Sequence, residues 1–234
     1  MTDMAGMVLA AGLGTRIRAL EPSTPKPLIK VAGRPLIDYA IQTLREGGVR
    51  RIVINVHHCA DQVEAYARGL KHLEVHISDE RDALLETGGG IIKALPLLGD
   101  APFFCTNTDA IMRGGSRPPA RVLSEAWDES CDALLLMVPM GAVSGLDSKG
   151  DFSLAPDGTI QDREAGEPLA FTGLQILRPA LFAGAPVAPI STRAFWQKAR
   201  DAGRMKGVRF DGDWMHVGDP QGHAEAERRL AASG

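Results

Sequence analysis

The sequence of 234 residues has few cysteines and no long apolar run, and both absences exclude classes of protein. Its three cysteines, Cys59, Cys105 and Cys131, are scattered and include no Cys-x-x-Cys pair. Such an odd set argues against a disulfide framework and against a zinc site. The first apolar run has no basic segment before it and stops at Gly12, too short for a signal peptide or a membrane span. We therefore expect a cytoplasmic protein with no membrane partner.

The sequence also lacks a strong charge of either sign. Its 26 lysines and arginines against 29 aspartates and glutamates give a formal net charge of −3, so no basic field indicates a nucleic-acid partner. Hydrophobic residues make up 44 % and charged residues 24 %, which is ordinary for a globular chain. Internal repeats, low-complexity segments and an interdomain linker are absent. We expect residues 1–234 to form one unit.

Strand and helix patterns alternate through the first half of the chain. We expect strands over 7–11, 51–56, 73–77 and 101–109, and helices over 35–46, 60–70 and 86–98. This alternation predicts an α/β fold with a mainly parallel central sheet and helices on both faces. The second half is less regular, and we expect helices over 117–127, 192–202 and 220–230, strands over 133–139, 169–177 and 207–210, and a small antiparallel hairpin region over 144–160.

The loop after the first strand has the composition of an anion site. Gly12 and Gly14 allow a tight turn in which the backbone can approach a ligand, and successive amides in such a turn form an anion-binding concavity. Arg16 adds a planar fork suited to phosphate oxygens. The loop is not a P-loop, and Ile17 stands where a dinucleotide fingerprint needs its third glycine, which argues against a nicotinamide oxidoreductase.

Two further charges complete the expected site. Lys26 stands between Pro25 and Pro27, which we expect to hold it in an extended segment. Asp109 ends the predicted strand 101–109, at the edge of a parallel sheet where ligands bind. A carboxylate there suits a divalent cation that neutralises phosphates, although an aspartate that caps the next turn is an equally common arrangement.

The whole pattern resembles a known signature. Residues 9–16 read Leu-Ala-Ala-Gly-Leu-Gly-Thr-Arg and residues 25–28 read Pro-Lys-Pro-Leu, which is similar to the signature of the sugar-1-phosphate nucleotidyltransferases. This resemblance implies a Rossmann-like, GT-A-like nucleotidyltransferase fold, with a nucleotide-binding half over 1–112 and a sugar-binding half over 113–234. It implies that a nucleoside triphosphate and a sugar 1-phosphate give a nucleotide sugar and pyrophosphate.

The resemblance also implies roles for individual residues. Arg16 would bind the departing pyrophosphate, Lys26 the α-phosphate, and Asp109, in a segment similar to the family's Asn-x-Asp, a Mg²⁺ ion. The glycines of residues 86–90 would let the base and ribose lie against the backbone, unless they only form a flexible helix start. The implied nucleotide contacts are Leu9, Ala10, Ala11, Gly12, Gly14, Thr15, Glu86, Gly88, Gly89 and Asn107, and the implied sugar contacts are Glu164, Thr172 and Gly173.

The chain departs from the family pattern in two places. Family members carry Trp-x-Asp-Val-Gly-Thr-Pro near the end, whereas His216 replaces that aspartate here. Asp109 would then hold the ion with phosphates and water, or Asp213 or Asp219 would reach in, or His216 would shift metal choice toward Mn²⁺; a packing role for His216 is the alternative. The usual lysine for the sugar phosphate is also missing from residues 162–168, and either Arg163 supplies that charge or no residue does.

The substrates are implied by a narrower resemblance. Residues 84–99, Leu-Leu-Glu-Thr-Gly-Gly-Gly-Ile-Ile-Lys-Ala-Leu-Pro-Leu-Leu-Gly, are most similar to short bacterial enzymes that make UDP-N-acetylmuramic acid from UTP and N-acetylmuramate 1-phosphate in cell-wall recycling. A mannose-1-phosphate guanylyltransferase is the second interpretation. A catalytically silent nucleotide-binding relative is an alternative of another class, suggested by His216 and the missing lysine. The sequence makes no prediction of oligomeric state.

Overall fold

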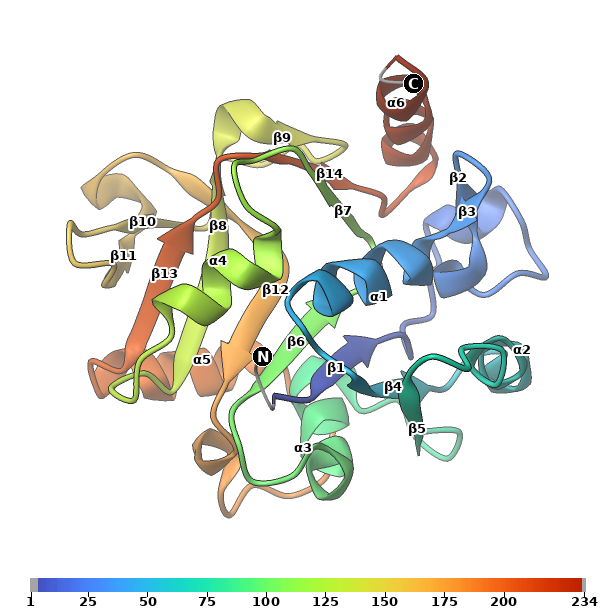
Figure 1. The fold of residues 1–234 in the computed structure, drawn as a ribbon, viewed down its shortest axis with the longest axis horizontal. Helices are drawn as coiled ribbons and strands as arrows, with labels where there is room; N and C mark the ends of the chain where they lie inside the picture. The colour runs from blue at the N-terminus through green and yellow to red at the C-terminus, as the bar shows by residue number, and fades with distance from the viewer. Residues whose placement is uncertain (1–3, 233–234) are drawn as a thin grey trace.

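A computed structural model describes residues 4–232 and contains one mixed sheet of nine strands (Figure 1). These strands are β1 (Gly6–Leu9), β4 (Arg51–Val56), β5 (Glu74–Asp79), β6 (Phe103–Asn107), β8 (Ala133–Pro139), β10 (Phe152–Leu154), β11 (Ile160–Asp162), β12 (Leu169–Leu177) and β13 (Met205–Arg209). Their order along the sheet is β11-β10-β12-β6-β1-β4-β5, and β8 pairs with both β12 and β13.

The first half of the chain supplies the parallel part of the sheet. β1 lies between β4 and β6, β5 lies beyond β4, and all these pairs are parallel. The largely apolar and buried strands β1, β4 and β6 suit burial on both faces, whereas β5 at the edge is more polar and only partly buried. In the second half β12 is antiparallel to β6 and β8, while β13 is parallel to β8. The predicted α/β fold with its mainly parallel centre is confirmed.

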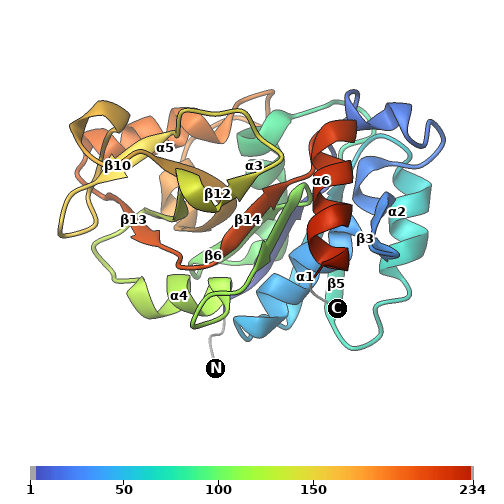
Figure 2. The same ribbon diagram turned by 90° about the horizontal axis from the view of Figure 1, so that it is seen from above.

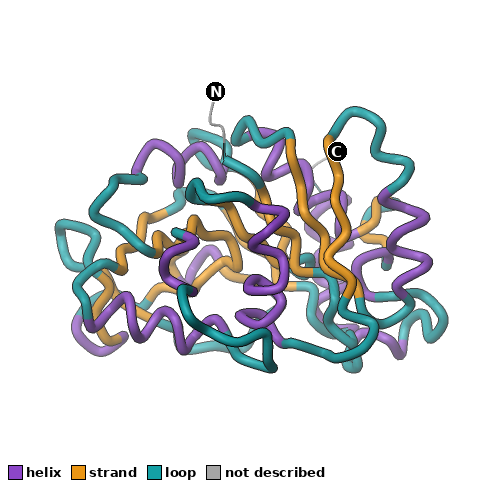
Figure 3. Tube along the Cα trace, turned by 90° about the horizontal axis from the view of Figure 1, so that it is seen from below, coloured by secondary structure: helices purple, strands orange, loops and turns teal. Residues whose placement is uncertain are grey.

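Residues 4–232 contain the six α-helices that the sequence predicts, and five of them, α1 to α5, pack on this sheet. The six are α1 (Leu36–Glu46), α2 (Ala60–Ala67), α3 (Glu86–Leu98), α4 (Pro119–Ala126), α5 (Thr192–Asp201) and α6 (Pro220–Ala231). The apolar sides of α1, α2 and α4 belong to one buried cluster, and those of α3 and α5 belong to a second. Figures 1, 2 and 3 show helices on both sides of the central strands. The sixth helix, α6, lies beside β14 of the small sheet described next (Figure 2).

A second sheet, which the sequence does not predict, joins the two halves of the chain. Its strands are β7 (Ala110–Arg113), β9 (Val143–Ser144) and β14 (Asp213–His216). β14 is antiparallel to β7 and parallel to β9, with His216 opposite Ala110. A third apolar cluster, which includes Met215 of β14 and Ala226 of α6, joins this small sheet to α6. The pairing brings the end of the chain next to Asp109.

Two hairpins complete the architecture. β10 and β11 are antiparallel, which confirms the expected hairpin region, and Gly158 turns between them with φ +83°. A short pair, β2 (Lys30–Val31) and β3 (Arg34–Pro35), precedes α1. Among the helices of residues 4–232, none has the length and apolar character needed to cross a membrane.

Candidate nucleotide-binding site

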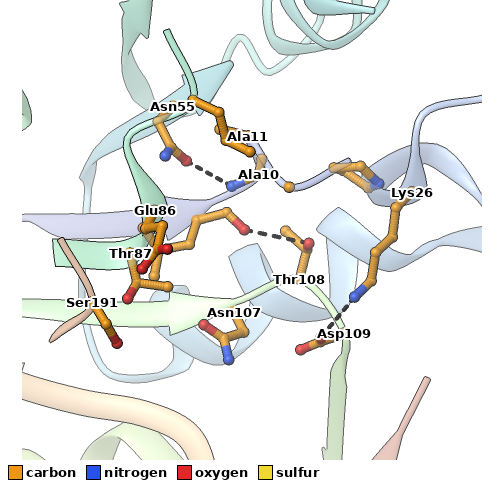
Figure 4. Close-up of a pocket in the computed structure, with 14 residues that line it drawn as sticks. Ala10, Ala11, Lys26, Asn55, Glu86, Thr87, Asn107, Thr108, Asp109 and Ser191 are labelled. Atoms are coloured by element: carbon orange, nitrogen blue, oxygen red, sulfur yellow. Dashed lines mark hydrogen bonds and ion pairs between the residues drawn. The ribbon is translucent and has the colours of Figure 1, made fainter. Parts of the chain in front are cut away.

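The carboxyl ends of β1, β4 and β6 and the start of α3 surround a cavity of about 410 Å³ (Figure 4). Open α/β sheets bind ligands at this edge. The cavity is lined by Leu9, Ala10, Ala11, Gly12, Lys26, Pro27, Asn55, Leu84, Glu86, Thr87, Asn107, Thr108, Asp109 and Ser191. Eight of the residues expected from the sequence are therefore brought together in one wall.

Lys26 and Asp109 form an ion pair at one end of this cavity. The Lys26 Nζ atom donates to Asp109 Oδ2 at 2.6 Å, and the two side chains are 15 % and 19 % exposed. Burial alone would raise the pKa of Asp109, but the adjacent Lys26 ammonium and then His216 lower it below its ordinary value. The carboxylate is thus ionised and reachable from the cavity. The crevice that Lys26 faces contains Asp109, as the nucleotide interpretation requires.

The glycine loop packs against the stem of Lys26. Gly14 has φ +59°, and a Cβ atom on it would lie 2.7 Å from the Cβ atom of Lys26. The expectation of an extended Lys26 is wrong, because residues 26–28 form a 3₁₀ turn in which the Leu28 amide donates to the Pro25 carbonyl at 2.8 Å. The fixed φ of Pro27 also suits such a turn.

Of the loop residues 12–16, only Gly12 lines the cavity. Gly12 lines it with nothing within 4 Å of the position a Cβ atom would take, so the backbone there is open to a ligand. Thr15 and Arg16 are exposed and do not line the cavity. Arg16 is nevertheless close enough to His216 to lower the pKa of that imidazole.

His216 lies beside Asp109, at the end of β14. The amide of the next residue, Val217, donates to the Asp109 carbonyl at 2.8 Å. Burial lowers the pKa of His216, and its neighbour Asp109 opposes that effect while Lys26 adds to it. A neutral imidazole can act as a metal ligand.

The other two carboxylates considered for the metal have different roles. Asp213 is at the opposite end of β14, about 10 Å along the strand from His216, and it pairs with Arg113 in the small sheet. It does not reach Asp109. Asp219 caps α6, accepting the Gly222 amide at 2.8 Å.

The metal-ligating side chains at this cavity fit a magnesium ion that binds together with a nucleotide better than they fit a preformed metal centre. Across residues 4–232 no three His, Cys, Asp or Glu side chains are grouped to hold a metal. Asp109 supplies one ionised carboxylate at the cavity, with His216 beside it. Mg²⁺ commonly uses one or two carboxylates together with substrate phosphates and water. The residues present therefore fit an ion that arrives with a polyphosphate.

The start of α3 is held by a segment of the second half. The amides of Gly88 and Gly89 both donate to the Ile190 carbonyl, at 2.8 and 3.0 Å, and a Cβ atom on Gly89 would lie 2.0 Å from the Ala188 carbonyl oxygen. The two glycines are buried and do not line the cavity. Their space is used by residues 188–191, rather than by a base as the sequence suggests.

The three expected sugar contacts are not gathered in the cavity. Thr172 is fully buried, where its hydroxyl donates to the Leu136 carbonyl and accepts the Leu174 amide. Glu164 is exposed on a short turn and pairs with Arg163. Gly173 has φ +89°, and a Cβ atom on it would lie 2.9 Å from Asn107 Nδ2. Gly173 therefore makes room for a cavity residue, whereas Thr172 stabilises the irregular part of β12.

Sequence reasoning misses a buried polar pair behind the cavity. Asn55 Oδ1 accepts the Ala10 amide at 2.7 Å, and Asn55 Nδ2 donates to Glu80 Oε1 at 2.7 Å. Glu80 is fully buried and its Oε2 atom has no partner among the described residues. The sequence contains one signal for this pair, because Asn55 interrupts the apolar run of β4, Arg-Ile-Val-Ile-Asn-Val. A polar side chain buried in such a run requires a hydrogen-bonding partner.

Residues 6–146 match the model of the MobA-like NTP transferase domain family. The chain belongs to this family. It is also 44 % identical over 232 residues to the N-acetylmuramate alpha-1-phosphate uridylyltransferase of Caulobacter vibrioides, with 96 % of each chain covered. A protein of the same name from Neisseria meningitidis serogroup B is 35 % identical, with 92 % of this chain and 93 % of that one covered.

The fold of this chain is also similar to that of a solved structure. The structure titled UDP-glucose pyrophosphorylase complexed with UDP-glucose matches with a TM-score of 0.81 at 17 % identity, and the match covers 100 % of both chains. At this identity the likeness concerns the fold alone. The nucleotidyltransferase fold that the sequence predicts is therefore confirmed.

Proposed function

We propose that this chain transfers the uridylyl group of UTP to N-acetylmuramate 1-phosphate, giving UDP-N-acetylmuramic acid and pyrophosphate. The observation that carries the substrates is the 44 % identity to a uridylyltransferase of that name over 96 % of both chains. The geometry supports the reaction class, because a glycine loop, Lys26 and Asp109 meet at one cavity. Residues 1–112 supply most of the nucleotide site, and residues 113–234 the sugar side.

The chemistry asks the protein for alignment and charge neutralisation. The nucleophile is an oxygen of the sugar phosphate, which is already ionised at neutral pH, so no general base is needed. Attack on the α-phosphorus forms the new P–O bond and breaks the bond to the bridging oxygen, and pyrophosphate leaves with the electron pair. We assign the loop amides of residues 12–16 to the triphosphate, Lys26 to the α-phosphate and Arg16 to the departing pyrophosphate.

A divalent ion belongs to this proposal. Asp109 would hold Mg²⁺, or Mn²⁺, with His216 beside it, and the ion would neutralise charge on the phosphates. Lys26 would exchange its partner Asp109 for a phosphate oxygen when the nucleotide binds. Leu9, Ala10, Ala11, Gly12, Glu86 and Asn107 are the proposed nucleotide contacts, and the sugar is proposed to lie near Gly173.

Pyrophosphate release from a matrix of substrates tests the proposal. The purified chain is mixed with Mg²⁺, with UTP or GTP, and with N-acetylmuramate 1-phosphate, mannose 1-phosphate or glucose 1-phosphate. We expect the highest rate from UTP with N-acetylmuramate 1-phosphate. A preference for GTP with mannose 1-phosphate would overturn the substrates and favour a guanylyltransferase. Absence of pyrophosphate in every mixture would favour a catalytically silent nucleotide-binding relative.

A further inference from the structure

Glu86 is a cavity residue whose carboxylate has no partner. It is the first residue of α3, it is exposed, and it lines the cavity. Within the described part of the chain its side chain forms no hydrogen bond or ion pair. The other two charged side chains in the cavity wall, Lys26 and Asp109, are paired with each other. Glu86 is therefore a free hydrogen-bond acceptor in the cavity wall.

The backbone of Glu86 has a conformation that ordinarily favours glycine. Its φ is +58°, and the only other non-glycine residues of 4–232 with positive φ are Ala32 and Cys59. A side chain in this region is strained, so such residues gather at functional sites. Neighbouring bonds hold the segment, since the Ile190 amide donates to the Leu85 carbonyl at 3.2 Å. Glycine would be unstrained at this position, so the strain of a glutamate here points to a use for its carboxylate.

The Lys26–Asp109 ion pair and the Glu86 carboxylate lie at different ends of the cavity. Figure 4 shows Lys26 and Asp109 well separated from Glu86, which lies near Thr87 and Ser191. A triphosphate would take the Lys26 end, because a free carboxylate repels phosphate. Glu86 then faces the uncharged part of the nucleotide. A carboxylate only accepts hydrogen bonds, and ribose offers two neighbouring hydroxyl donors where uracil offers a single N–H group.

We propose that the Glu86 carboxylate accepts hydrogen bonds from the ribose hydroxyls, including the 2′-hydroxyl, and so selects ribonucleotides over 2′-deoxyribonucleotides. An acidic residue has this role in dinucleotide-binding folds, where it binds the ribose 2′-hydroxyl. This inference rests on the proposed function, because it requires a nucleoside triphosphate in the same cavity.

Binding of UTP and dUTP to the full chain, measured by calorimetry, tests the proposal. We expect the wild-type chain to prefer UTP about tenfold, the size typical of one hydrogen bond to a charged group. Glu86→Gly should bring the ratio close to one, and Glu86→Gln, which keeps one acceptor oxygen, should give an intermediate ratio. Ala32→Gly is the matched control, since it changes a positive-φ residue outside the cavity and should leave the ratio unchanged.

Thermal unfolding separates this role from a structural one. Glycine removes the strain at position 86, so Glu86→Gly should fold with an undiminished Tm while it loses the preference for UTP. Equal binding of UTP and dUTP by the wild-type chain, or an equal loss of both in Glu86→Gly, would overturn this inference and leave the proposed function standing. Failure of the wild-type chain to bind either nucleotide would overturn both.

Discussion

At the scale of single residues, Asn55 links the end of β1 to a buried glutamate. Its amide group is used in both directions, toward the Ala10 amide and toward Glu80 Oε1. Gly90 leaves room for this pair, because a Cβ atom on it would lie 2.7 Å from Glu80 Oε1. Glu80 therefore fixes the orientation of Asn55, and Asn55 fixes a backbone segment of the cavity wall. Burial raises the pKa of Glu80, which the hydrogen bond from Asn55 only partly opposes.

Glu80→Gln should change how stability depends on pH. The raised pKa means that folded Glu80 keeps its proton at a pH where the unfolded chain has lost it, so wild-type stability falls as pH rises through that window. Glutamine keeps an oxygen acceptor for Asn55 but does not titrate. Urea unfolding between about pH 4.5 and 7 should show the free energy of unfolding of the wild type falling relative to that of the variant. If the free energies of unfolding of the two proteins changed in parallel with pH, the raised pKa of buried Glu80 would be contradicted.

His216→Asp tests whether position 216 belongs to the metal site. Two carboxylates would then face each other, so the variant should have a lower Tm than the wild type in EDTA. Mg²⁺ binds the folded state and should raise the Tm of the variant more than that of the wild type. Scanning calorimetry with EDTA or with Mg²⁺ measures this. A chain that fails to fold under both conditions would assign His216 to packing.

At the scale of elements, the segment 188–191 explains why the first turn of α3 contains glycine at positions 88 and 89. Helix propensity alone predicts that alanine at position 89 would stabilise the protein by about 1 kcal/mol. The Ala188 carbonyl oxygen occupies the space instead, 2.0 Å from where the Cβ atom would lie. The packing of the second half onto α3 thus depends on the absence of a side chain.

Gly89→Ala should therefore lower the free energy of unfolding by about 2 kcal/mol, because the added methyl group displaces the backbone at 188. Gly141→Ala is the control, since nothing lies within 4 Å of the Cβ position there. Urea denaturation of the three proteins gives the comparison. Stabilisation of Gly89→Ala would mean that the segment yields readily and that helix propensity dominates.

The predictable elements are those with a local signal. The main strands are located by their apolar runs. The end of α1 is located by Gly47 and Gly48, and the β10–β11 hairpin by the turn at 156–158. β7 and β14 escape prediction because each has only four residues and its partner is about a hundred residues away in sequence. The same limit applies to the site. The cavity-forming loops follow from the strand ends, whereas the Asn55–Glu80 pair and the segment 188–191 depend on tertiary contacts.

At the scale of the whole molecule, the site is built where the two halves meet. Asp109 follows β6 of the parallel sheet, and its carbonyl accepts the Val217 amide from the end of the chain. Ser191, from the second half, lines the same cavity as Gly12. β12 joins β6 edge to edge, so the main sheet is continuous across the two halves. Division into a nucleotide half and a sugar half stays a prediction about function.

The central claim is that the Asp109 carboxylate, beside Lys26, is required to hold a nucleoside triphosphate and its metal ion for transfer. The most direct test is the initial rate of pyrophosphate release from UTP and N-acetylmuramate 1-phosphate with Mg²⁺, measured for the wild type and for Asp109→Asn. Losing the carboxylate that pairs with Lys26 in the cavity wall should lower the rate about a thousandfold or more at any Mg²⁺ concentration, with the fold retained by circular dichroism. A near-normal rate in the variant would contradict the account.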